Sequence, residues 1–235
     1  MPIMMGSGSS GMMSETGVAA IVSSVSLPAI ALFEVVWVIG MAAMMFPAMI
    51  PMVLFYNKVK TKLESNLTMA RIGGTPLFLA GYLVTYAILG AGAFLAVYAV
   101  LALSSMYSVP SWVALVAPSG VLIGAGIYQF SSLKNRCLSQ CVSPFGFFAT
   151  HSRTGLTGAF RMGFSHGTFC VGCCWAYMLV MLAVGAMSIP VMLALTGVIA
   201  LEKVIVRGST WFNRGVGVGL ALLGVLVALF PGALP

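Results

Sequence analysis

The chain has 235 residues, of which 60% are hydrophobic and only 6% are charged. Soluble domains carry about 25% charged residues, so this composition excludes an ordinary soluble domain. The formal net charge of +7 does not indicate nucleic-acid binding, because the basic residues lie in short links beside apolar spans. We therefore expect an all-α fold, a polytopic transmembrane helix bundle that contacts the lipid bilayer of the cell membrane and binds no nucleic acid.

The chain divides into an N-terminal tail and one membrane domain. Residues 1–27 are rich in Gly, Ser and Met and predict a flexible tail, followed by a single transmembrane helical domain over 28–235. Because no basic segment precedes an apolar stretch at the N-terminus, we do not expect a cleaved signal peptide. Long apolar runs predict about six spans, at 28–55, 76–103, 110–130, 158–185, 190–206 and 212–230.

The basic residues predict the orientation of these spans. Lys and Arg occur in the links 56–75, 131–157 and 207–211, whereas 104–109 and 186–190 contain neither residue. Links that carry Lys and Arg face the cytoplasm, according to the positive-inside rule. Every link obeys that rule when both termini lie outside, and every link breaks it in the opposite orientation. We therefore expect the N- and C-termini outside.

One stretch carries most of the chain's metal-ligand chemistry. HGTFCVGCCWAYM, residues 166–178, contains one of two histidines and three of five cysteines. On a helix, His166, Cys170, Cys173 and Cys174 share one face. Thiolates and imidazoles bind Zn and Cu, and thiolates favour soft ions such as Cu(I). The alternative is that the cysteines are small apolar residues that let helices pack closely.

The rise of the helix limits which of these side chains can share an ion. His166 and Cys174 are separated by about 12 Å along a straight helix, so one ion cannot bind all four. We expect Cys170 to share an ion with Cys173 or Cys174, completed by a ligand from another helix. His166 would then serve a neighbouring site or an entry step.

The first span carries a stripe of methionines on one broad helical face. Thioethers bind Cu(I) well and Zn poorly, although methionine is also an ordinary apolar packing residue. We expect these methionines to supply the missing ligands, which requires the stripe to face the cysteine helix; the sequence alone does not show that it does. Its members fall at i, i+3, i+4, i+8 and i+11, and are Met41, Met44, Met45, Met49 and Met52.

Three further residues are candidate ligands. Cys137 and Cys141 lie four residues apart just past the third span, where nearby cations favour thiolates. They could form an inner docking site for a metal, form a redox pair, or be ordinary cytosolic cysteines. Glu202 lies near the inner end of the fifth span, beside Lys203. A carboxylate there is costly and indicates function, unless it faces the headgroups.

These motifs resemble an uncharacterised family of prokaryotic proteins that are described as predicted metal-binding integral membrane proteins. The resemblance covers most of the chain from Trp37 to Lys203. It rests on MAAMMFPAMIP at 41–51, YQFSSLKNRCLSQC at 128–141, HGTFCVGCCWAYM at 166–178 and the Glu202–Lys203 pair. It implies a metal-binding membrane protein and supplies no reaction. Three positions depart from the usual pattern without removing a potential ligand: Ser132, Val142 and Tyr177.

Three functions fit these observations. The first is binding, transport or delivery of a soft transition-metal ion, with Cu(I) favoured over Zn(II). The second is a transmembrane thiol–disulfide carrier, since Cys170 and Cys173 form a C-x-x-C and Cys137/Cys141 could be its partner pair. The third is a subunit of a larger membrane complex or a homo-oligomer. No catalytic triad, phosphate loop or acid–base carboxylate pair occurs, so we do not expect an ordinary enzyme.

Overall fold

The computed structural model describes residues 26–63, 68–107, 111–185 and 189–230. Within these ranges the chain is all-helical and contains no strand, which confirms the predicted fold class. The predicted tail, 1–27, lies almost entirely outside the described residues. The elements are α2 (Leu27–Leu63), α3 (Thr68–Met106), α4 (Ser111–Tyr128), α5 (Ser132–Val142), α6 (Pro144–His151), α7 (Gly155–Gly185), α8 (Ile189–Ala200), the π-helical turn η1 (Leu201–Ile205) and α9 (Thr210–Leu229).

Four of the described helices are long and apolar enough to cross a membrane, which is compatible with a membrane protein. They cover Leu27–Val59, Gly73–Met106, Gly155–Ala183 and Thr210–Leu229. The predicted third and fifth spans are shorter: the apolar part of α4 is Val116–Tyr128, and α8 has 12 residues before it continues into η1. The count of six spans and the orientation of the termini therefore stay predictions.

The polar stretch 131–157, expected as a link, folds into two helices. Ser131 caps α5 by accepting a hydrogen bond from the backbone N of Lys134 at 3.1 Å. Ser143 caps α6 in the same way, and Pro144 occupies its first turn. Helix α5 buries Lys134, Leu138 and Cys141, which the helical spacing places on one face. This face packs against α7, so part of the polar stretch belongs to the interior.

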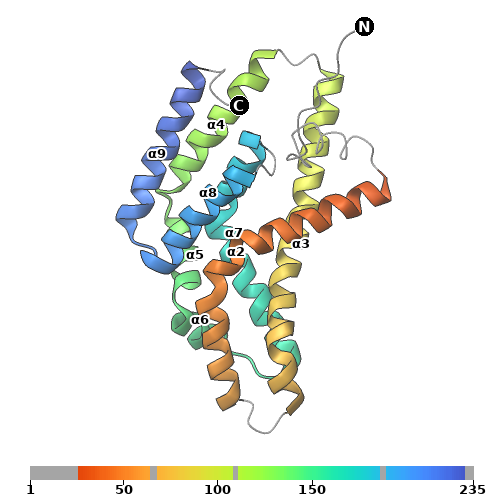
Figure 1. The fold of residues 1–235 in the computed structure, drawn as a ribbon, viewed down its shortest axis with the longest axis vertical. Coiled ribbons are helices and arrows are strands. Elements are labelled where there is room, and N and C mark those ends of the chain that lie inside the picture. Colours follow the sequence, from red (N-terminus) through yellow and green to blue (C-terminus); the bar gives the residue numbers. More distant parts are fainter. Residues whose placement is uncertain (1–25, 64–67, 108–110, 186–188, 231–235) are drawn as a thin grey trace.

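Helix α7 is the central element of the bundle. It packs against α3, α4, α5 and α8, while α4 also lies alongside α9 (Figure 1). The α3–α7 contact is backbone to backbone: a Cβ added at Gly163 would lie 1.9 Å from the carbonyl oxygen of Phe78, and one added at Gly81 would lie 2.2 Å from that of Phe160. Only glycine permits this approach, which fixes α7 against its longest neighbour.

Helix α2 is sharply bent near its middle (Figure 1), and Pro47 and Pro51 lie inside it. A proline removes one backbone hydrogen bond and clashes with the preceding turn, which accounts for the bend. The methionine face of this helix is turned into the protein interior. Each of its five members is 1–3% exposed and belongs to the same core as the α7 cysteines: Met41, Met44, Met45, Met49 and Met52.

Replacing Gly163 with alanine should destabilise the bundle, because its methyl group cannot be accommodated against the backbone of α3. We expect a loss of about 1–3 kcal/mol in the free energy of unfolding, measured by thermal or denaturant unfolding in detergent. Gly92→Ala is the control, since nothing lies within 4 Å of a Cβ added there. Equal stability of the two variants would contradict the close α3–α7 contact.

Candidate metal centre

Three buried thiols from two helices meet beside the middle of the bundle. The Sγ atoms of Cys141 on α5 and of Cys170 and Cys173 on α7 all lie within 4.8 Å of one another. The Sγ atoms of Cys141 and Cys173 are 3.8 Å apart. Sulfurs that each lie about 2.3 Å from a shared ion are themselves about 4 Å apart, so this group, the thiol triad, is close to the geometry of a metal site.

The triad differs in one respect from the arrangement expected from the sequence. Cys170 and Cys173 lie together with Cys141 of α5, whereas the sequence predicts that the ligand from another helix is a methionine of the first span. Cys174 is not in the triad, but its Sγ atom lies 3.3 Å from that of Cys173 and is also buried.

A buried ammonium group lies against the triad. The Nζ atom of Lys203 donates a hydrogen bond to the Sγ atom of Cys170 at 2.9 Å, and the Tyr82 hydroxyl lies 3.3 Å from the same sulfur. Lys203 is 7% exposed. A buried cation is costly unless an anion or a hydrogen-bond acceptor compensates it, so its position favours a thiolate at Cys170. The sequence singled out Lys203 only as a neighbour of Glu202, and nothing in it indicated Tyr82.

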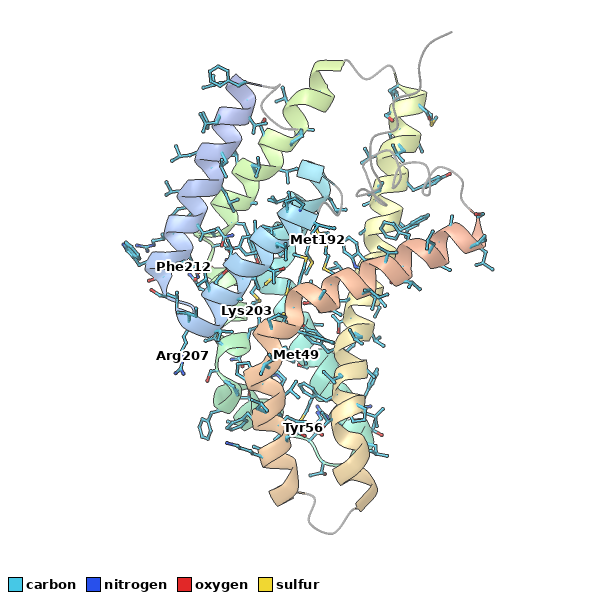
Figure 2. All side chains as sticks on the ribbon, in the orientation of Figure 1. Met49, Tyr56, Met192, Lys203, Arg207 and Phe212 are labelled. Carbon is cyan, nitrogen blue, oxygen red and sulfur yellow. The ribbon has the colours of Figure 1, made fainter. Side chains whose placement is uncertain are left out.

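A small void adjoins the triad on the side of α2. It has no room for a water molecule, and Met45, Met49, His166, Cys170 and Lys203 contribute to its lining. Met41 is buried in the same core but does not line the void. In Figure 2, Met49 and Lys203 lie near the centre of the molecule, where the bend of α2 meets the end of α8. Thioether, thiol and imidazole donors thus surround one dry space.

His166 is held between aromatic rings at the edge of this void. Its ring stacks with those of Tyr82 and Phe78, at centroid distances of 5.9 and 6.3 Å, and its side chain is 3% exposed. The Nδ1 atom has no hydrogen-bond partner among the described residues. A buried nitrogen without a partner is costly, and a soft metal ion in the void would satisfy it. His166 and the thiol of Cys170 therefore line the same void, although they are four residues apart on α7.

The two cysteines of α5 have different surroundings. Cys141 joins the triad, whereas Cys137 packs against α7 at Gly172, where an added Cβ would lie 2.7 Å from the Cys137 sulfur. Burial raises the pKa of the Cys137 thiol, so it stays protonated at neutral pH and is a poor nucleophile. Within this short motif, Cys141 is therefore a candidate metal ligand and Cys137 is a packing residue.

Glu202 lies in a polar network of its own. Its Oε1 atom is 2.7 Å from the Nζ atom of Lys134, and its Oε2 atom accepts a hydrogen bond from the Tyr177 hydroxyl at 3.0 Å. Lys134 also donates to the side-chain oxygen of Gln129. Among the described His, Cys, Asp and Glu residues, the metal-like group contains no carboxylate. Glu202 therefore contacts Lys134 and Tyr177 and does not belong to the thiol triad.

Comparison with known protein families gives a match over most of the chain. The sequence model of a protein family described as PpoB2, copper chaperone, matches residues 34–227. That range contains all three thiols of the triad, the methionine face of α2 and the turn η1. No curated protein and no solved structure matches the chain.

The two cysteines of α5 provide a matched test of this geometry. Cys141→Ser should lower the affinity for Cu(I) by roughly tenfold or more, because it removes one of the three thiols. Cys137→Ser should leave the affinity unchanged, since its sulfur packs against Gly172. Titration of the purified protein with Cu(I) against a coloured chelator measures both variants. Equal losses in the two would contradict the assignment of Cys141 alone to the site.

Proposed function

Because the chain belongs to the PpoB2 copper chaperone family, we propose that it binds Cu(I) at the thiol triad and delivers it to an acceptor protein at the membrane. The observation that carries this proposal is the meeting of three buried Sγ atoms within 4.8 Å. Soft thiolates suit Cu(I), whereas structural Zn(II) sites are almost always tetrahedral with four ligands. Three thiols therefore favour Cu(I).

The charge around the triad also supports a monovalent ion. Cu(I) held by two thiolates and one thiol carries one net negative charge. The Lys203 ammonium, 2.9 Å from the Cys170 sulfur, balances that charge. An isolated charge in an apolar interior is costly, so this balance stabilises the loaded site.

The void beside the triad offers weaker ligands for exchange. Met45 and Met49 present thioethers and His166 an unpartnered imidazole nitrogen next to Cys170. Neutral thioethers bind Cu(I) less tightly than thiolates, so they suit an ion in transit. We propose that Cu(I) enters and leaves the triad through this void, with the methionine face of α2 as the first acceptor.

A thiol–disulfide carrier is the second candidate, because thiols 3.3 and 3.8 Å apart are close enough for exchange chemistry. Its difficulty is access, since all three thiols of the triad are buried and the half-buried Cys137 stays protonated. A redox-dependent disulfide within the triad, formed in cells and reversed by reduction, would favour this function over copper delivery.

Metal analysis of the purified protein tests the proposal directly. The wild-type protein loaded under reducing conditions should retain about one Cu(I) per chain and release added Zn(II) more readily. The variant Cys141→Ser/Cys170→Ser/Cys173→Ser should retain neither ion. Elemental analysis after desalting gives both numbers. Equal copper in the wild type and the triple variant, or stronger retention of zinc than of copper, would overturn the proposal.

Removing the charge of Lys203 should weaken the site without removing a ligand. We expect Lys203→Met to lower the Cu(I) affinity by roughly tenfold, because the bound complex then keeps an uncompensated charge. Arg207→Met removes an exposed cation four residues away and should have no effect. The same chelator titration measures both affinities. Unchanged affinity in Lys203→Met would show that the ammonium does not balance the charge of the bound ion.

A further inference from the structure

A buried ion pair joins three elements beside the thiol triad. Lys134 and Glu202 are 0% and 2% exposed, and their side chains are 2.7 Å apart. The Tyr177 hydroxyl donates to Glu202 at 3.0 Å and lies 3.3 Å from the Nζ atom of Lys134. Gln129 accepts a further hydrogen bond from Lys134. These contacts connect α5, η1 and α7 in one polar junction, hereafter the Lys134–Glu202 junction.

Each element of the junction also carries a group of the copper site. Lys134 shares α5 with Cys141, and both face the interior. Glu202 shares η1 with Lys203, whose ammonium bonds the Cys170 sulfur. The separation of Lys134 and Cys141 along the helix is about 10 Å, which is two turns. A rotation or slip of α5 at the junction would therefore displace the Cys141 thiol.

Two adjacent charges of the π-helical turn both face inward. Successive residues of an α-helix point about 100° apart, so two adjacent side chains face different partners. In η1 the backbone N of Val206 bonds the oxygen of Leu201, five residues earlier, at 2.9 Å, and the turn is wider. Glu202 and Lys203 are both buried, one directed to Lys134 and the other to Cys170.

The ion pair gives α5 a directional restraint in addition to its apolar packing. The helix has 11 residues, a length that is marginal in isolation, and it buries only Lys134, Leu138 and Cys141. Apolar contacts do not select one rotation strongly, whereas a buried ion pair with its hydrogen bonds requires a single geometry. The junction thus adds a directional contact to the packing of Leu138 in the core and of Cys137 against Gly172.

We propose that Lys134 and Glu202 are positioning residues for copper: their ion pair fixes α5 and η1 against α7 so that Cys141 completes the thiol triad. The role of the ion pair in copper binding rests on the proposed function. The placement of Cys141 by the ion pair can be tested without copper. The ion pair does not contact the metal ion. It acts through the position of a ligand that it holds two turns away.

The decisive variant is Lys134→Met/Glu202→Met, because it removes both charges, keeps similar volume and leaves no unpaired charge in the interior. In the Cu(I)-loaded full-length protein, X-ray absorption should show the copper–sulfur coordination number falling from three to two. The Cu(I) affinity should fall by roughly tenfold. Adding Cys141→Ser to this variant should cause no further loss, since the thiol is already displaced.

A measurement on the metal-free protein makes the test independent of copper. Mild oxidation should link Cys141 to Cys173 in the wild type, where their sulfurs are 3.8 Å apart, and markedly less in the double variant. Arg136→Met is the control, because it removes an exposed cation from the same helix and should leave the cross-link and the coordination number unchanged. Thermal unfolding checks that each variant is folded.

The outcomes separate the two proposals. Three sulfurs on copper and an undiminished cross-link in the folded double variant would overturn the positioning role. A cross-link that depends on the ion pair, in a wild-type protein that binds no Cu(I), would overturn the copper function and leave the placement of Cys141 standing. An additive loss on combining the double variant with Cys141→Ser would also contradict the positioning role, because it would mean that Cys141 still binds.

Discussion

A charge inside an apolar helix bundle has to be compensated, and this constraint organises the central part of the molecule. Lys134, Glu202 and Lys203 are all buried. The first two compensate each other, and the third lies on the sulfur of Cys170. Because these residues come from segments far apart in the sequence, their pairing brings α5 and η1 onto α7. The most polar segment of the chain is thereby part of the interior, next to the thiols.

The sequence predicted the parts of the site that follow regular helical spacing. The spacing of Cys170 and Cys173 placed both on one face of α7, and the helical period of the α2 methionines predicted a common face, which is buried. The rise of about 12 Å predicts that His166 and Cys174 do not bind one ion, and the structure shows that His166 lines the same void as Cys170.

Other parts could not be predicted from helical spacing. The polar composition of 131–157 did not indicate helix α5. The buried residues of this helix, Lys134, Leu138 and Cys141, nevertheless follow an ordinary helical period. Which helix supplies the third thiol depends on tertiary packing, so nothing local distinguished Cys141 from the methionines. Lys203 as well as Glu202 faces inward, and the π-helical turn that carries them does not follow a 3.6-residue period. The number of spans and the orientation of the termini remain predictions from apolar length and basic links.

The family and the structure supply different parts of the functional argument. Membership connects the chain to copper, and the match at 34–227 includes nearly all the described helices. The structure connects copper handling to particular atoms, since it distinguishes the thiols of Cys141 and Cys137 on the same short helix. The proposed delivery of copper also requires its release, and the thioethers of Met45 and Met49, which line the void beside Cys170, would be the weaker ligands for that exchange.

The void beside the triad is too small for water, and this has a consequence for how an ion is delivered. A metal ion cannot bring its hydration shell to Cys170, so each water has to be replaced by a sulfur or nitrogen ligand along the way. Strongly hydrated divalent ions give up their water at a high cost in free energy, whereas soft Cu(I) exchanges readily between sulfur ligands. The cost of dehydration would therefore favour Cu(I) over divalent ions in this interior, in addition to any preference of the ligands themselves. Under the proposed function, the same dryness would require copper to pass to its acceptor by direct ligand exchange, without release into solution.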